Sequence, residues 1–561
     1  MFQVQHLRKD YAARTVLSNV TFVINDGEHV GLIGPNGTGK STLLRLLTGQ
    51  EPPDAGTISF APASQTIGYL PQASATADGS NVRALIDAAL APLRAAEAAL
   101  EQAAAALATA RDTTSAMQAY AEATAQFEAR GGYQAEQHIA EILGGLGLDS
   151  IDVERPLASL SGGQKTRLGL ATLLLRTPDV LLLDEPTNHL DVAALQWLED
   201  FVRGYPKAAL IVSHDREFLD RTVSRTLYLD PTTTMVKSYT GGYSAFADAR
   251  AHERDLHAET WQKQQEYITK VEGDIARLRG QALSVELSTT PRQPQVRRIA
   301  KKVAKKAKSR ERKLERYLES DERVEKPRQS WGLKLDFGEP PAAGRALLRV
   351  AGVSFSYPII AGGETSAPLL DDVSFEVGYG ERLALVGANG AGKTTLLKLI
   401  AGALQPDRGT IRLGSGVRLG VMAQEQETLD QTKTVLETAQ RARPISDTEA
   451  RGFLHFFLFS GDSVFRPVGL CSLGERSRLQ LALLVLQGCN LLLLDEPLNH
   501  LDIEAREHFE QALEAFDGTV IAVAHDRAFL RSYPERVIAV GGGGVRNYVG
   551  GYEQYLAALP V

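Results

Sequence analysis

The chain has 561 residues, a formal net charge of −7 and two cysteines, with 43% hydrophobic and 23% charged residues. A chain of this length exceeds one hydrophobic core, so we expect roughly three or four packing units. The two cysteines, Cys471 and Cys489, exclude a disulfide framework and indicate a reducing compartment, the cytoplasm. No signal peptide is evident, and no run approaches the ~20 apolar residues that span a bilayer. We therefore predict no membrane insertion.

The first chemical motif is the glycine-rich segment at 34–42, GPNGTGKST, which follows an apolar strand pattern at 29–33. It fits G-x-x-x-x-G-K-[ST], a loop whose backbone N–H groups cradle phosphates at a helix N-terminus. We expect Lys40 to reach the β- and γ-phosphates of ATP and Ser41 to ligate Mg²⁺. The predicted ATP-binding residues of this loop are Gly34, Pro35, Asn36, Gly37, Thr38, Gly39, Lys40, Ser41 and Thr42.

An alanine-rich stretch at about 88–130 follows, with Leu93, Leu100 and Leu107 recurring every seven residues. The pattern predicts a helical hairpin that projects from the first domain as an arm. It contains few basic residues, so a packing or spacing element is as good a reading as a contact surface.

The segment at 160–168, LSGGQKTRL, contains no acid or base suited to cutting a phosphate bond. A serine hydroxyl and backbone N–H groups at a helix start instead suit a clamp for the γ-phosphate of a nucleotide that the other domain holds. The predicted clamp residues are Ser161, Gly162, Gly163 and Gln164.

The buried-strand pattern VLLLDE at 180–185 ends in two acids, and such strands present ligands at their C-terminal edge. We expect Asp184 to hold Mg²⁺, directly or through water, and Glu185 to polarise the attacking water. His214 follows a short apolar strand and is predicted to bind the γ-phosphate and orient the glutamate. Gln72 is predicted to bridge the Mg²⁺ region to the helical part of the domain.

A second insertion at about 248–335 carries apolar residues at heptad spacing, including Trp261, Ile268 and Ile275. The pattern predicts two long antiparallel helices. Within it, residues 291–316 hold twelve Lys or Arg and two Glu, a local charge of +10 on an otherwise acidic chain. Such a segment indicates an anion-binding element, although a charge run is often a solvated face. The predicted RNA-binding residues are Arg297, Arg298, Lys301, Lys302, Lys305, Lys306, Lys308 and Arg310.

The rest of the chain repeats the motifs of the first domain in the same order, and the spacings between the later motifs match. The step from Ser161 to Asp184 is 23 residues, as is the step from Ser472 to Asp495. Two homologous domains are therefore predicted, at 1–247 and 336–561. The second phosphate loop consists of Gly387, Ala388, Asn389, Gly390, Ala391, Gly392, Lys393, Thr394 and Thr395. The other predicted counterparts are Ser472, Gly474 and Glu475 for the clamp, Asp495, Thr394 and Gln424 for Mg²⁺, and Glu496, His525 and Gln424 for catalysis.

Tyr11 and Tyr357 precede the lysines of the two loops by 29 and 36 residues. An aromatic ring at such a place can stack on adenine, and an ordinary strand tyrosine is the alternative.

The combination of LSGGQ with the glycine-rich loop and LLLDEP resembles the ATP-binding cassette superfamily. Two cassettes in one chain, DEPTNHLD and DEPLNHLD, and a charged helical linker are similar to its ABC-F family. The resemblance implies an α/β fold of two P-loop cassettes in tandem, with a helical hairpin in the first and a long helical hairpin linker between them. It also implies ATP hydrolysis with Mg²⁺ at two composite sites within a monomer, and action on the ribosome near rRNA and peptidyl-tRNA.

In the implied pairing, the loop of each cassette faces the clamp of the other. The sequence departs from the family at the second clamp, where Cys471 and Leu473 replace a leucine and a glycine. We expect this change to slow the site that contains Lys40. The resemblance leaves a translation factor and an antibiotic-resistance protein open. Two competing functions are the motor of a transporter with separate membrane subunits and a DNA-associated ATPase.

Overall fold

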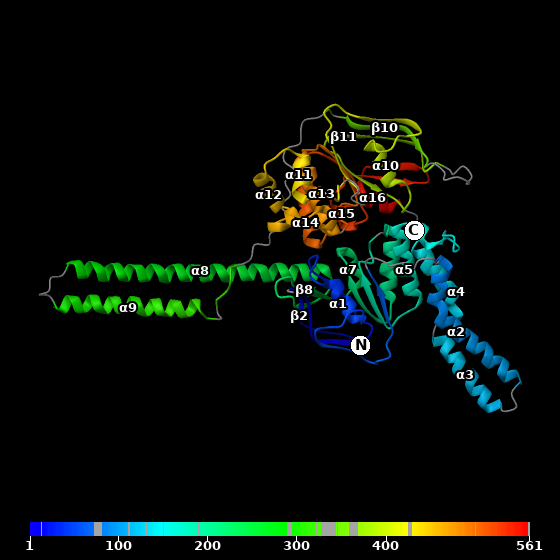
Figure 1. Cartoon of the computed structure of the whole chain (residues 1–561), viewed down its shortest axis with the longest axis horizontal. Coiled ribbons are helices and arrows are strands. Elements are labelled where there is room, and N and C mark those ends of the chain that lie inside the picture. The colour runs from blue at the N-terminus through cyan, green and yellow to red at the C-terminus, as the bar shows by residue number, and fades with distance from the viewer. Residues whose placement is uncertain are drawn as a thin grey trace. The chain divides into compact units, whose positions relative to one another are not determined.

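The computed structural model describes residues 1–12, 14–71, 81–109, 113–129, 132–149, 151–188, 190–288, 294–320, 323–326, 344, 346–357, 368–423, 429–499 and 501–558. These fall into two compact units, one of Met1–Tyr243 with Gly332–Val561 and one of Ser244–Trp331. The first unit contains two α/β cassettes and the second is a helical hairpin (Figure 1).

Each cassette is built on a six-stranded sheet in which five strands are parallel and the last is antiparallel. In the first cassette the order is β5-β6-β7-β3-β8-β9. Its strands are β3 (His29–Ile33), β5 (Ile67–Leu70), β6 (Val180–Asp184), β7 (Ala208–Val212), β8 (Arg225–Leu229) and β9 (Val236–Thr240). The second has the same order, β14-β15-β16-β12-β17-β18. Its strands are β12 (Arg382–Val386), β14 (Leu419–Met422), β15 (Leu491–Asp495), β16 (Thr519–Val523), β17 (Arg536–Gly541) and β18 (Gly544–Tyr548).

A three-stranded antiparallel sheet accompanies each of these, in the orders β2-β1-β4 and β11-β10-β13. Its strands are β1 (Phe2–Tyr11), β2 (Arg14–Ile24) and β4 (Ala55–Phe60), with β10 (Ala346–Phe355), β11 (Leu370–Gly378) and β13 (Arg408–Leu413) in the second copy. The identical order in both copies confirms the predicted tandem of α/β cassettes.

Strands β6 and β15, which lie inside their sheets, are buried along their whole length. Central parallel strands are covered by other elements on both faces, which explains why the sequence there is a continuous apolar run rather than an alternating one. Each run ends in an aspartate, so the fold delivers a carboxylate to the C-terminal edge of each sheet.

The helices of the first cassette include a long pair that forms the predicted arm, α2 and α3, which pack on each other (Figure 1). The bounds are α1 (Lys40–Leu47), α2 (Val82–Thr109), α3 (Thr113–Ala129), α4 (Ala135–Gly145), α5 (Gly162–Leu175), α6 (Val192–Gly204) and α7 (Arg216–Thr222). The second cassette has α10 (Lys393–Ile400), α11 (Val435–Ala442), α12 (Asp447–His455), α13 (Leu473–Gln487), α14 (Ile503–Glu514), α15 (Arg527–Ser532) and α16 (Gly551–Ala557).

The second unit consists of α8 (Tyr243–Ser288), whose first residue still belongs to the first unit, and α9 (Pro294–Leu318). The two helices run side by side in Figure 1. The predicted seam is its inner face, because Ile275 on α8 and Ala307 and Leu314 on α9 are buried. An aromatic contact between the two helices reinforces the seam. The rings of Tyr267 and Tyr317 meet edge to face, with their centroids 5.4 Å apart. The hairpin is thus held by its own core.

Candidate functional site

The phosphate loop of each cassette is closed by the side chain of its lysine. Lys40 is buried, and its ammonium donates hydrogen bonds to the carbonyl oxygens of Gly34 at 2.6 Å and Pro35 at 3.2 Å. Lys393 repeats the arrangement, with donor–acceptor distances of 2.7 and 2.9 Å to the matching carbonyls. Burial lowers the pKa of both lysines, and nearby carboxylates oppose the shift.

A glycine precedes each lysine because the backbone at this position has a positive φ, which other residues rarely adopt. Gly39 has φ 107° at the N-cap of α1, and a Cβ there would lie 2.4 Å from a methyl group of Val16. The counterpart Gly392 has φ 100° at the N-cap of α10. The left-handed conformation turns the following N–H groups of the helix start toward the loop, as a phosphate cradle requires.

The residues predicted to hold Mg²⁺ meet at the sheet edge. The hydroxyl of Ser41 lies close enough to Asp184, and that of Thr394 to Asp495, to stabilise the ionised carboxylate. Burial raises the pKa of both aspartates, that of Asp495 to about 6. One carboxylate oxygen of each is buried without a hydrogen-bond partner among the described residues. Each cassette therefore offers Mg²⁺ a hydroxyl oxygen and a carboxylate oxygen, the kind of ligand that this cation prefers. These residues fit the cation in each cassette.

Both glutamates that follow these aspartates have a left-handed backbone, with φ 54° at Glu185 and φ 50° at Glu496. Strain of this kind persists where the surrounding structure fixes it, which is typical of functional sites. Here each backbone N–H donates to a carbonyl of the neighbouring strand at 2.9 Å, from Glu185 to Val212 and from Glu496 to Val523. The same conformation therefore aims both side chains from equivalent positions.

The predicted histidines lie beside these glutamates. His214 Nε2 is 3.3 Å from Glu185 Oε1, and His525 Nε2 is 3.8 Å from Glu496 Oε1. Burial raises the pKa of Glu185 to about 7, against the opposing charge of Lys40. Burial likewise lowers the pKa of His214 well below its usual value, so this imidazole is neutral. A carboxyl group tuned near neutral pH beside a neutral imidazole suits general-base work.

The predicted clamp residues lie at the starts of α5 and α13 and also stabilise those helices. The Ser161 hydroxyl accepts from the Gln164 N–H at 3.2 Å, and the Gln164 side chain accepts from the Ser161 N–H at 3.1 Å. Ser472 and Glu475 form the same capping box. The pattern S-x-x-Q could have indicated this role in the sequence. The side chain of Leu473 lies outside the described residues, as do Gln72 and Gln424.

The two tyrosines lie next to the phosphate-loop helices. The Tyr11 hydroxyl donates to Glu51, and the Tyr357 hydroxyl lies 3.1 Å from the hydroxyl of Thr395. Tyr11 and Tyr357 are exposed, at 41% and 52%. An exposed ring beside the phosphate loop is compatible with stacking on adenine, which stays a prediction.

The aspartates of the repeated NHLD segments link the cassettes, a role that the sequence did not reveal. Asp502 accepts a hydrogen bond from the backbone N–H of Asn36, in the first phosphate loop, at 3.0 Å. Asp191 accepts one from the N–H of Asn389, in the second loop, at 3.1 Å. Each phosphate loop is therefore held by a hydrogen bond from its backbone to the opposite cassette. In the sequence, the repetition of Leu-Asp in both copies was the only indication of this contact.

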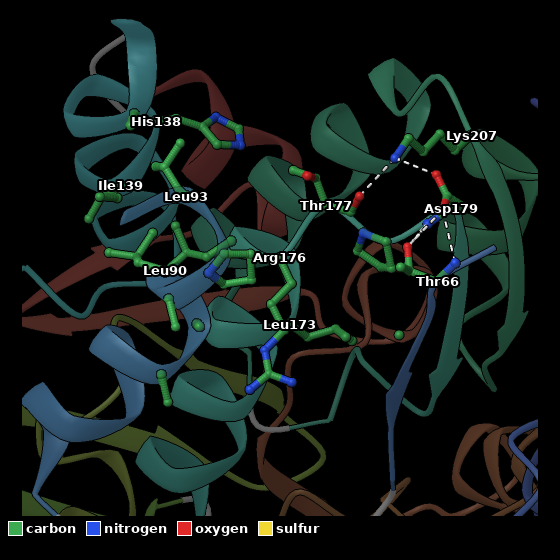
Figure 2. Close-up of a pocket in the computed structure, with 18 of the residues that line it drawn as sticks. Thr66, Leu90, Leu93, His138, Ile139, Leu173, Arg176, Thr177, Asp179 and Lys207 are labelled. Atoms are coloured by element: carbon green, nitrogen blue, oxygen red, sulfur yellow. Dashed lines mark hydrogen bonds and ion pairs between the residues drawn. The ribbon is translucent and has the colours of Figure 1, made fainter. Parts of the chain in front are cut away.

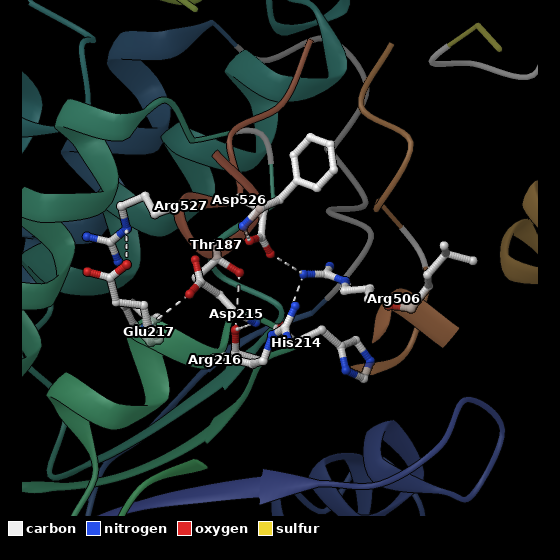
Figure 3. Close-up of polar contacts among 12 residues, drawn as sticks. Thr187, His214, Asp215, Arg216, Glu217, Arg506, Asp526 and Arg527 are labelled. Carbon is white, nitrogen blue, oxygen red and sulfur yellow. Dashed lines mark hydrogen bonds and ion pairs between the residues drawn. The ribbon is translucent and has the colours of Figure 1, made fainter. Parts of the chain in front are cut away.

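A pseudo-symmetric set of ion pairs surrounds these contacts. Arg527 on α15 pairs with Glu199 on α6, with Nη1 3.0 Å from Oε2, and Arg216 on α7 pairs with Glu510 on α14. Each arginine follows the His-Asp pair of its cassette, and each glutamate lies eight residues beyond the NHLD aspartate. Figure 3 shows the centre of this interface. A related pairing at both sites is what two composite sites require.

A groove of about 1100 Å³ lies elsewhere in the first cassette, among β5, α2, α4 and the end of α5 (Figure 2). Its wall includes the ion pair between Lys207 and Asp179 at 2.8 Å, and apolar side chains such as Leu90 and Leu173. None of the predicted nucleotide-binding residues lines it. Size alone therefore does not identify the site, which lies at the phosphate loops.

Comparisons with known proteins agree with this geometry. The sequence profile of a family described as ABC transporter matches residues 17–188 and 370–499, and a second profile with that description matches residues 232–335. ABC transporter F family member 5 of Arabidopsis thaliana is 34% identical over 561 residues, covering 99% of this chain and 77% of that protein. The tylosin resistance ATP-binding protein TlrC of Streptomyces fradiae is 38% identical, covering 92% of this chain and 93% of that protein.

Among solved structures, the complex of an archaeal ribosomal stalk protein with the archaeal ribosome recycling factor aABCE1 has a similar fold. The TM-score is 0.59 at 18% identity, over 99% of this chain and 92% of that chain. In the described part of this chain, no helix is both long and apolar enough to cross a membrane.

The fold and the paired sites define a tandem ATP-binding cassette ATPase. The chain belongs to the ABC-F family.

Proposed function

We propose that this ATPase acts on the ribosome in the cytoplasm, as a monomer whose cassettes close on two ATP molecules. The observation that carries the proposal is the composition of α9. Lys301, Lys302, Lys305, Lys306 and Lys308 are all exposed, whereas Ala307 and Leu314 of the same helix are buried. A stiff hairpin that presents lysines on its outer face suits a phosphate backbone, and rRNA or peptidyl-tRNA is the polyanion we infer.

The arginines of the same helix differ in their availability. Arg310 is 2.7 Å from Asp274 across the hairpin, so part of its charge is used to hold α9 on α8. Arg298 is exposed, and the side chain of Arg297 lies outside the described residues. The lysines therefore supply most of the free positive charge that the proposal needs.

At each site, we assign the chemistry to the residues that the two cassettes bring together. Lys40 and the N–H groups of the first loop bind the phosphates, and Ser41 and Asp184 would hold Mg²⁺, which neutralises phosphate charge. Glu185 accepts a proton from the attacking water, and His214 orients Glu185. The second site uses the equivalent residues from Lys393 to His525, and Ser161 and Ser472 clamp the nucleotide of the opposite cassette.

The test uses a chain that binds ATP without hydrolysing it, the double variant Glu185→Gln and Glu496→Gln. We expect it to sediment with ribosomes on a sucrose gradient in the presence of ATP. Replacing the four lysines at 301, 302, 305 and 306 with Gln should release it and flatten the salt dependence of binding, because fewer counterions are exchanged. The matched control replaces the same four with Arg, which keeps the charge.

Ribosome binding that is unchanged in the Gln variant at every salt concentration would overturn the assignment of α9. Sedimentation with membranes or with chromatin would instead favour a transporter motor or a DNA-associated ATPase. The similarity to TlrC supports a second, narrower candidate, protection against an antibiotic that acts on the ribosome. Growth of cells expressing the protein in the presence of tylosin tests that candidate directly.

A further inference from the structure

One arginine breaks the symmetry of the interface between the cassettes. Arg506 lies on α14 of the second cassette and is only 5% exposed. Its Nη1 donates to the backbone carbonyl of His214 in the first cassette at 2.9 Å and to Asp526 Oδ2 at 3.0 Å. Its Nε donates to the carbonyl of Leu501 at 3.1 Å. Figure 3 shows the side chain reaching between the two cassettes.

The first cassette has no such group at the equivalent place. Arg506 is the fourth residue after Asp502, and the fourth residue after Asp191 is Leu195. Leu195 is buried at the same interface, and its side chain carries no hydrogen-bond donor to offer the carbonyl of His525. The pair of Arg527 with Glu199 is matched by that of Arg216 with Glu510, whereas the contacts of Arg506 have no match at Leu195.

The contact of Arg506 that crosses between the cassettes reaches the Glu185 site, whereas its contacts with Asp526 and Leu501 stay within the second cassette. The same short segment of the second cassette holds the first phosphate loop, through the bond from Asn36 to Asp502 at 3.0 Å. It also holds the carbonyl of His214, whose ring is 3.3 Å from Glu185. The loop and the histidine of the first cassette are thus fixed by one piece of the opposite cassette.

The space around the guanidinium is small and is lined by both polar and apolar residues. A cavity of about 40 Å³ adjoins Arg506 and is lined by both cassettes, with Thr187, Asp215 and Leu195 from the first and Glu496, His525 and Asp526 among those from the second. That volume accommodates little more than a water molecule or two. A shorter apolar side chain at this position leaves the carbonyl and the carboxylate without their cationic donor, so the arginine is not simply filling space.

We propose that Arg506 is a positioning residue that holds His214 against Glu185 from the opposite cassette. Hydrolysis at the Glu185 site therefore depends on this residue more strongly than hydrolysis at the Glu496 site does. The inference rests on the roles proposed above for the two glutamates. It makes the two ATP sites unequal through a contact in the interface, independently of the Leu473 substitution.

The experiment measures each site separately. Glu496→Gln leaves the Glu185 site as the active one, and Glu185→Gln leaves the other. In the first background, Arg506→Leu should lower kcat by about tenfold or more, since a hydrogen bond from a charged donor is lost. In the second background it should lower kcat by less than about twofold. KM for ATP should stay unchanged in both, because the phosphate loops are not altered.

Two further variants separate positioning from general support of the interface. Arg506→Lys keeps the charge with a single point of donation, and we expect an intermediate loss of kcat confined to the Glu185 site. It also answers the question if Arg506→Leu fails to fold. Arg531→Leu is the matched control, because Arg531 pairs with Glu217 across the cassettes at 3.1 Å but contacts neither histidine. It should leave both sites unchanged.

Equal losses of kcat in the two backgrounds, for either Arg506 variant, would overturn the inference. A change confined to KM or to thermal unfolding would also overturn it, because both indicate a structural role. Hydrolysis that persists in the double variant Glu185→Gln and Glu496→Gln would be a different failure. It would refute the proposed roles of the glutamates themselves.

Discussion

The aspartates that join the cassettes allow the crossed arrangement of the sites to be tested directly. Asp502 uses both of its carboxylate oxygens. Oδ1 accepts from the N–H of Ala505 at 3.0 Å and caps α14, and Oδ2 accepts from the N–H of Asn36 at 3.0 Å. Asn has one acceptor oxygen in place of two, so Asp502→Asn must give up one of these bonds.

We expect the variant to keep the cap and lose the bond to the opposite loop. Asn is as good an N-cap as Asp, and the cap is local, whereas the other bond requires the cassettes to be closed. A hydrogen bond to a charged group contributes about 1.5–3 kcal/mol. Because about 1.4 kcal/mol corresponds to a tenfold change, turnover at the affected site should fall at least roughly tenfold.

The assay again uses chains with one active site. Asp502→Asn should lower turnover when the Glu185 site is the active one, because Asn36 belongs to that site. Asp191→Asn should lower turnover at the Glu496 site. The reasoning would be refuted if each substitution acted on the glutamate of its own cassette, since the contacts in the structure cross between cassettes.

A helix cap within the second cassette provides the control. Ser446 caps α12, accepting from the Glu449 N–H at 3.3 Å, and contributes about 1 kcal/mol to stability by this means. Ser446→Ala should lower the temperature of thermal unfolding without changing turnover at either site. A loss of turnover in this variant would mean that the assay reports stability rather than site geometry.

Three further outcomes are expected. The double variant Glu185→Gln and Glu496→Gln should hydrolyse ATP at least ~100-fold more slowly while still binding it, and near-normal release of phosphate would remove both residues from the mechanism. Ile275→Ala should destabilise the helical hairpin by about 2 kcal/mol, because a buried side chain of the seam is truncated, and hydrogen exchange along α8 would show it. The pKa of Asp179 is lowered to about 2 by a hydrogen bond from Lys207, so this group contributes stability above its ordinary pKa of 3.8 that is lost as the pH falls towards 2. Asp179→Asn should reduce that acid-induced loss in a denaturation series, and an unchanged pH dependence would contradict the assignment.

Much of the site could be predicted from short stretches of sequence, because its chemistry is encoded locally. The loop that ends in Lys40 needs its glycines for backbone conformations that few other residues adopt. The strand that ends in Asp184 must be apolar throughout, because it is buried on both faces. Both requirements apply to neighbouring residues, so they leave a readable pattern, and the repetition of that pattern predicted two cassettes.

The tertiary structure alone decided how the copies meet. Asn36 and Asp502 are 466 residues apart in the chain, and Arg506 and His214 are 292 apart. No local pattern specifies such partners, because their contact depends on the packing of two whole domains. The sequence likewise showed Arg310 only as one more basic residue, and its pairing with Asp274 appears only when α9 lies against α8. The sequence by itself therefore determined the chemical groups of each site, whereas packing determined which groups from opposite cassettes act together.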